Sequence, residues 1–406
     1  ISTSASLLLG LACTWYKCPT NLTIEDAFVT REFLSKLLAL HLPTLAMSDV
    51  STAPPAKLQI ISYLGLGLLH CGQAPRGLCQ MLARYLSERM PDNVNNGAKE
   101  TALQSTFASL SLGMMLFGGL ASKDPNVSRF SSDIFSELDI NVAENRLTAL
   151  IASSFIGFGS GRFINLHWSR SWNDMLKRPD PILFWSILAL RLSRWNDPIN
   201  LDLDYQGEDA DRIDFEAVLT SITLPDMDEE DAAAALPWID SSELALFSYV
   251  CTVLWANSYF VMLKLMGTRN QQALDALDHW IHIVRNHPSL RSHHIEYFAQ
   301  RLQNCLLRAY LGMLLARASI LNGTHDAATW SLLREFYAEP LQFSYGLSRV
   351  FHMALGLLFV KKPIRFECNR DVMIWILSAL PMHLASLDEA ELNALQYCES
   401  LWQLLV

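Results

Sequence analysis

Charged residues are scarce in this chain of 406 residues, at 18% of the sequence, whereas they make up about a quarter of a typical soluble domain. The formal net charge is −10, which argues against the broad basic surface of a nucleic-acid-binding protein. Hydrophobic residues reach 51%, far above the composition of disordered chains. Much of this apolar surface must therefore be covered by the chain itself, by partner subunits or by lipid.

Motifs of catalysis and metal binding are missing as well, because the sequence has no CxxC, HExxH or Gly-x-Ser-x-Gly element. His279 and His282 lie three residues apart, near Asp275 and Asp278, but no third ligand follows at a recognisable spacing. We interpret them as surface histidines. No catalytic residue, metal site or cofactor is predicted.

Two loops resemble ligand-binding motifs only in part. Residues 202–213 begin like a calcium-binding loop, but Ile213 stands where a bidentate Glu is needed. Residues 157–162 are glycine-rich, but Arg162 replaces the third glycine of a dinucleotide motif and no Lys-Ser/Thr pair follows. We predict a turn after a helix at 157–162 and no calcium site at 202–213.

The cysteines form no CxxC pair and mostly lie in apolar stretches. This distribution predicts buried free thiols in a reducing compartment. The chain begins at Ile1 without an initiating Met or a basic segment, so we expect a fragment of a longer protein. The eight cysteines are Cys13, Cys18, Cys71, Cys79, Cys251, Cys305, Cys368 and Cys398.

Residues 244–263 contain no charged residue over about the length that a bilayer requires. Ser, Thr and Asn occur in this run, and neither flank carries the basic cluster that would orient it in a membrane. A helix packed between two layers of a helical protein is also apolar on all sides. We favour that core helix and keep a membrane-associated helical protein as an alternative.

An internal repeat is the main feature that the sequence does contain. A very apolar helix with a central Leu-Gly or Ile-Gly pair is followed by a short polar turn and an amphipathic helix. Gly67 precedes Gly113 by 46 residues, and Gly113 precedes Gly157 by 44 residues. Two helices and two turns fit this period, so residues 1–406 are predicted to form one all-α domain of stacked helix pairs.

Glycine in the middle of an apolar helix costs about 1 kcal/mol relative to alanine, so its recurrence requires a reason. Close approach of neighbouring helices is the physical explanation, since glycine has no side chain at the contact. We predict such contacts at five structural repeat glycines: Gly67, Gly113, Gly157, Gly312 and Gly356.

Residues 196–240 differ from the rest, with fourteen acidic residues and one basic residue. We interpret this segment as an acidic insertion between the fourth and fifth repeats and expect its removal from 202 to 231 to leave the core intact. Its densest run is a candidate loop for docking a basic partner. That run comprises Asp226, Asp228, Glu229, Glu230 and Asp231.

The glycine pattern resembles the proteasome/cyclosome repeats. Residues 344–383, with Tyr345-Gly346-Leu347 and Phe351 to Phe359, are similar to the corresponding part of the anaphase-promoting complex subunit 1 family. Residues 171–180 also resemble that family, including the closing Pro-Asp pair.

The resemblance implies a closed toroid of inner and outer helix rings. It also implies a non-catalytic scaffold in a multisubunit ubiquitin ligase of the cell cycle, nuclear and cytoplasmic, in contact with other subunits, the degron-receiving module and a coactivator. Within the same repeat class, the alternative is a subunit of the proteasome regulatory particle that binds ubiquitin-like domains. Neither family implies a membrane, nucleic acid or small-molecule substrate.

Overall fold

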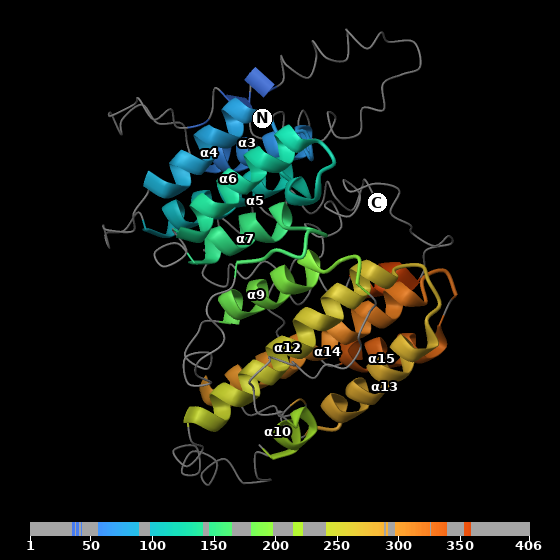
Figure 1. Cartoon of the computed structure of the whole chain (residues 1–406). Coiled ribbons are helices and arrows are strands. Elements are labelled where there is room, and N and C mark those ends of the chain that lie inside the picture. The colour runs from blue at the N-terminus through green and yellow to red at the C-terminus, as the bar shows by residue number, and fades with distance from the viewer. Residues whose placement is uncertain are drawn as a thin grey trace. The chain divides into compact units, whose positions relative to one another are not determined.

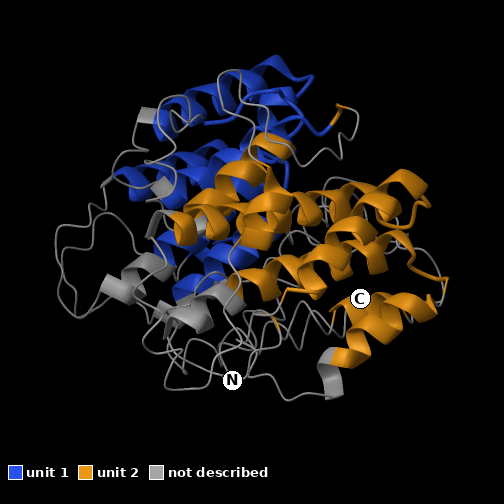
Figure 2. Ribbon diagram, turned by 90° about the horizontal axis from the view of Figure 1, so that it is seen from below, with its two compact units in different colours: residues 1–164, 192–195, 384–406 blue, residues 165–191, 196–383 orange. Residues whose placement is uncertain are grey.

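The computed structural model describes residues 56–88, 98–140, 146–164, 180–197, 214–221, 241–287, 297–324, 326–338 and 353–358, with a few isolated residues elsewhere. These segments are helices joined by turns, and no strand occurs among them. The all-α prediction is confirmed for this part of the chain. The chain divides into two compact units, coloured separately in Figure 2, and each is described by itself.

Unit 1 contains two layers of helices. α3 (Ala56–Leu69), α5 (Ala98–Met115) and α7 (Arg146–Ile156) pack side by side in that order. α4 (Arg76–Glu88) and α6 (Pro125–Ile140) form the second layer, where α4 contacts α5 and α6, and α6 contacts α7 (Figure 1). Successive helices of the chain thus alternate between the two layers, as the helix-pair repeat predicts.

The sequence explains which layer each helix occupies. All residues from 106 to 117, which include the second half of α5, are buried. The polar side chains among them are small, as close packing requires. α4 is amphipathic, with Leu82, Tyr85 and Leu86 buried and Arg84 exposed between them. Pro75 directly precedes α4, a favourable place because the first helical amides need no partner within the helix.

Unit 2 is built around one long helix pair. α12 (Ser241–Leu265) packs along α14 (Tyr297–Ile320), and α13 (Gln271–Arg285) and α15 (Ala327–Ala338) cover α14. α10 (Phe215–Ser221) contacts α12 and α13. Most of α9 (Asp180–Ser193) also belongs to this unit.

The apolar run at 244–263 lies in α12. Residues 243–265 are long and apolar enough to cross a membrane, but 94% of the most apolar window is buried inside the protein. Phe184 of α9 stacks on Trp255 of α12 with 4.3 Å between ring centroids. Protein side chains surround this helix, which is the environment of a core helix and favours that interpretation.

Three of the five predicted glycine contacts are confirmed. A Cβ at Gly67 would lie 2.9 Å from Ser111 Cα on α5, and a Cβ at Gly113 would lie 2.8 Å from Phe155 Cδ2 on α7. At Gly312 of α14 the nearest atom is Trp255 Cδ1 on α12, at 2.6 Å. At these positions glycine lets neighbouring helices of the first layer approach each other.

The other two glycines behave differently. A Cβ at Gly157 would lie 2.4 Å from the carbonyl oxygen of Arg162, which belongs to the turn that follows the same helix. Gly356 is exposed, and no atom lies within 4 Å of its Cβ position. The predicted contact is therefore wrong at Gly356 within the described residues. Gly67 and Gly113 are each contacted by the first-layer helix that follows in the chain. The described residues end two positions after Gly356, so no following helix is described there.

Substitution by valine should separate a packed glycine from an open one. Gly113→Val would force a branched side chain against Phe155, and we expect a loss of about 1–3 kcal/mol in unfolding free energy. Gly77 in α4 is exposed and has nothing within 4 Å of its Cβ position, so Gly77→Val should be neutral or slightly stabilising. Chemical denaturation of both variants measures this, and equal midpoints would contradict the packing explanation.

Candidate functional site

Turns that follow the first-layer helices carry a repeated hydrogen bond. In unit 1 the amide of Gly72, after α3, donates to the carbonyl of Met114 at the end of α5, at 2.9 Å. The amide of Gly118, after α5, donates in the same way to Phe155 of α7, also at 2.9 Å. Each helix end is thereby fixed to the next one through backbone atoms alone.

The glycine-rich loop at 157–162 makes the same kind of contact. Gly159 donates its amide to the carbonyl of Leu192 at 3.0 Å, and Gly161 donates to Ser193 at 2.9 Å. Both acceptors lie at the end of α9. The prediction of a turn after a helix is confirmed, and the loop uses its amides to hold protein carbonyls.

Unit 2 repeats the arrangement after α12, where the amide of Gly267 donates to the carbonyl of Ser319 at 2.9 Å. Lys264, near the end of α12, donates to the backbone carbonyl of Asp197. The turn bonds, which we call the turn ladder, therefore recur after α3, α5, α7 and α12.

The ladder depends on left-handed backbone. The turn glycines have φ between 65° and 80°, a region that side chains with a Cβ rarely occupy. A glycine just past a helix is also a common helix ending. Gly72 and Gly118 each lie five residues after a packed glycine, Gly67 and Gly113 respectively. Glycines with positive φ are Gly72, Gly118, Gly159, Gly161, Gly267 and Gly323.

α9 is an apolar helix that the glycine pattern does not mark. Its end accepts the ladder bonds from the turn after α7, and within unit 2 its Arg191 Nε donates to Asn257 Oδ1 of α12 at 2.7 Å. Its centre is Leu188-Ala189-Leu190, where no glycine occurs. The Leu-Gly and Ile-Gly pairs therefore do not mark every helix that takes part in the ladder.

The acidic segment at 196–240 also contains a structural element. Phe215 and Leu219 of α10 are buried, at 2% and 1% exposure, and the Phe215 ring meets Trp280 of α13 at 6.3 Å. The expectation that residues 202–231 can be removed without cost is corrected here, since removal would uncover α12 and α13. Asp226, Asp228, Glu229, Glu230 and Asp231 lie outside the described residues, as does the loop at 202–213.

An arginine at the end of α14 connects three helices. Arg317 Nε contacts Asp278 Oδ1 of α13 at 2.7 Å, and its Nη1 contacts Asp326, the residue before α15. Asp326 also accepts the amide of Thr329 at 2.8 Å, which caps α15. Burial disfavours the charge on Asp326, but the hydrogen bonds from Thr329 and the charge of Arg317 outweigh it and lower the pKa of the carboxyl.

His279 of α13 lies near a carboxylate of α10. His279 Nε2 lies 3.7 Å from Glu216 Oε2, and both side chains are more than half exposed. Within the segments that the structure describes, no group of three potential ligands is close enough to hold a metal ion.

Four cysteines lie in the described residues, and none of the four forms a disulfide there. Cys79, Cys251 and Cys305 are buried, and Cys71 is partly buried. Burial raises the pKa of the Cys79 thiol to about 12, so this sulfur stays protonated and unreactive. The other four cysteines lie outside the described residues.

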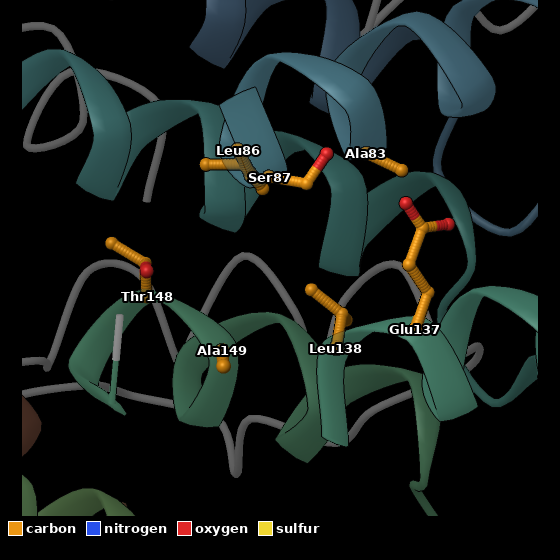
Figure 3. Close-up of a pocket in the computed structure, with 7 residues that line it drawn as sticks. All are labelled: Ala83, Leu86, Ser87, Glu137, Leu138, Thr148 and Ala149. Carbon is orange, nitrogen blue, oxygen red and sulfur yellow. The ribbon is translucent and has the colours of Figure 1, made fainter. Parts of the chain in front are cut away.

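A hollow between α4, α6 and α7 is too small for a substrate. Figure 3 shows side chains from the three helices around it, and its volume of about 10 Å³ is roughly that needed for one water molecule. Its lining residues are Ala83, Leu86, Ser87, Glu137, Leu138, Thr148 and Ala149.

Comparison with known families identifies the chain. The family described as the APC1 fifth domain matches residues 174–404, more than half of the sequence. The chain belongs to the APC1 family, that of anaphase-promoting complex subunit 1. A comparison with curated proteins finds no match.

Membership of the APC1 family supports a role as a subunit of the anaphase-promoting complex, a ubiquitin ligase of the cell cycle. The match gives no support to the proteasomal alternative. It covers α9 to α15 and the residues 344–383 on which the resemblance was strongest. In such a subunit the functional surfaces are contacts with other proteins, so the turns and exposed helix faces are the candidate sites.

The buried face of α10 can be tested by truncation. Phe215→Ala should lower the unfolding free energy by about 3 kcal/mol, because a large buried ring is lost. Glu216→Ala on the exposed face is the control and should stay within about 0.5 kcal/mol of the parent. Thermal and chemical unfolding measure both, and a neutral Phe215→Ala would show that α10 is dispensable.

The Arg317 cluster predicts a pH-dependent contribution to stability. Because the pKa of Asp326 is lowered in the folded chain, its stabilisation is present above the unfolded pKa of about 4 and is lost as pH falls through the folded pKa. Asp326→Ala removes both cap and charge and should cost about 1–2 kcal/mol at pH 7.

Asp326→Asn is the matched control, since asparagine caps a helix equally well. It should cost less than alanine, and its difference from the parent should shrink as pH falls below 4. Urea denaturation at several pH values measures both variants. A constant difference between parent and Asn variant down to low pH would contradict a role for the Asp326 charge.

Proposed function

We propose that this chain is a non-catalytic scaffold domain of the anaphase-promoting complex, which organises neighbouring subunits and the degron-receiving module. The observation that carries the proposal is the turn ladder. It fixes successive helices through backbone hydrogen bonds and leaves side chains of the turns and outer helices available for partners.

The finer points of the proposal follow from the family resemblance. The helix pairs close into a toroid with an inner and an outer ring, and the coactivator contacts this region or its neighbours. The complex works in the nucleus and cytoplasm, which suits free buried thiols. Repeat arrays of this kind present partner contacts over extended surfaces instead of one pocket, in keeping with the small hollow beside α4.

Affinity purification of the full-length parent protein tests the assignment. We expect cullin-like and RING subunits to copurify with it. Recovery of proteasomal ATPases in their place would overturn the proposal in favour of the regulatory-particle alternative. A requirement for detergent to extract the protein would favour the membrane alternative.

Two variants relate the assembly to the repeat architecture. Gly113→Val perturbs the α5–α7 contact and should reduce the yield of copurified subunits, whereas Gly77→Val should leave it unchanged. If both variants recover the full set of subunits at wild-type yield while Gly113→Val is clearly destabilised, the packing of unit 1 does not matter for assembly.

A further inference from the structure

Four exposed cations of unit 1 lie in or directly beside the turns that follow its helices. Arg76 opens α4 after the turn of α3, Lys123 follows the turn of α5, Arg162 follows that of α7, and Arg194 follows α9. We call these four residues the basic edge. One cation follows each of the helices α3, α5, α7 and α9, although the whole chain has a net charge of −10.

The turn ladder fixes the order of these cations. The turn preceding Arg76 bonds to the end of α5 through Gly72 and Ala74, at 2.9 and 3.0 Å. The turns after α5 and α7 bond in the same way to the helices that follow them. Neighbouring turns are therefore held side by side by backbone atoms, so the residues that carry the cations follow one another in the order of the helices.

A row of aromatic rings makes the same edge rigid. Phe117 stacks on Phe158 with 4.6 Å between centroids, and Phe158 meets Trp195 at 4.9 Å. Each ring comes from the turn after a different helix: α5, α7 and α9. Since the rings are in contact, the turns cannot slide past one another without breaking aromatic packing.

Two members of the basic edge are also positioned by α6. Arg162 lies over the Phe135 ring at 5.2 Å and its Nη1 donates to Ser132 Oγ at 3.1 Å. Arg76 lies over the Phe130 ring at 5.8 Å. Among the described residues, Lys123 and Arg194 have no such ring contact and no ion pair, so their charges are the more available to a partner.

Carboxylates only partly offset this charge. Asp124 lies beside Lys123, and its Oδ1 accepts the amide of Asn126 at 2.9 Å to cap α6. Asp197 follows Arg194 by three residues and lies in unit 2, where its charge acts on Lys264. The four cations of the basic edge outnumber these two neighbouring carboxylates.

We propose that the basic edge binds an extended, acidic segment of a partner protein, an inference that rests on the proposed scaffold role. Packed helices lie about 8–10 Å apart, and an extended chain advances about 3.3 Å per residue. Carboxylates at every third residue would thus meet successive cations. A nucleic acid fits less well, because its phosphates would continue beyond this edge and face a chain whose net charge is negative.

Peptide binding to the full 406-residue chain tests the spacing. One fluorescein-labelled 12-residue peptide carries Glu at every third position with Ser and Gly between, and a second has the same composition with its four Glu residues adjacent. Fluorescence anisotropy in 50 mM salt should show tighter binding of the spaced peptide. Equal affinity for the two peptides, or no binding of the spaced one, would overturn the proposal.

Variants of the chain test whether the spaced peptide binds at the basic edge. Lys123→Gln combined with Arg194→Gln should weaken binding of the spaced peptide at least about fivefold, since two exposed charge pairs are lost. Arg84→Gln, which removes an exposed cation of α4 away from the turns, is the control and should bind like the parent. Equal binding by the double variant and the control would place the peptide elsewhere and contradict the proposal.

Two further outcomes are informative. A single-stranded oligonucleotide of equal charge that binds more tightly than the peptide, and is lost in the double variant, would reassign the edge to nucleic acid. If the peptide experiment fails while the parent protein still copurifies with cullin-like and RING subunits, the basic edge is wrong and the scaffold role stands.

Discussion

The architecture depends on one backbone hydrogen bond, made repeatedly. A glycine in left-handed conformation ends a helix and gives its amide to a carbonyl at the end of the next helix, as Gly72 does to Met114 and Gly267 to Ser319. The bond uses no side chain, so the sequence around it can vary while the stacking is kept. Packed glycines such as Gly113 then bring the helix bodies together behind the fixed ends.

Much of this could be predicted from periodicity, and the failures have physical causes. Leu-Gly centres revealed α3, α5 and α14 because close contact there removes the side chain. α9 carries no such centre, because its contacts use larger residues, such as Phe184 against Trp255. α10 was missed because its two buried residues, Phe215 and Leu219, are surrounded by acidic ones, and a seven-residue helix offers too short a pattern to detect.

Candidate sites were harder to predict than the fold. The glycine-rich loop at 157–162 and the histidines of α13 suggest ligands by residue type, yet the loop amides hold protein carbonyls and His279 pairs with a carboxylate. The basic edge has no motif, since its members are far apart in sequence and become neighbours only through the ladder. For a member of the APC1 family, such composite surfaces suit the binding of partner subunits better than a pocket would.

Hydrogen exchange of each ladder amide also reports when the two helices that it joins separate. Turn amides would normally exchange quickly with solvent, and Gly72 is itself exposed. Its proton is nevertheless held by a carbonyl of a different helix, so it exchanges only when two adjacent helices separate. Comparing exchange at Gly72, Gly118 and Gly267 would therefore show whether the array opens at one joint or as a whole.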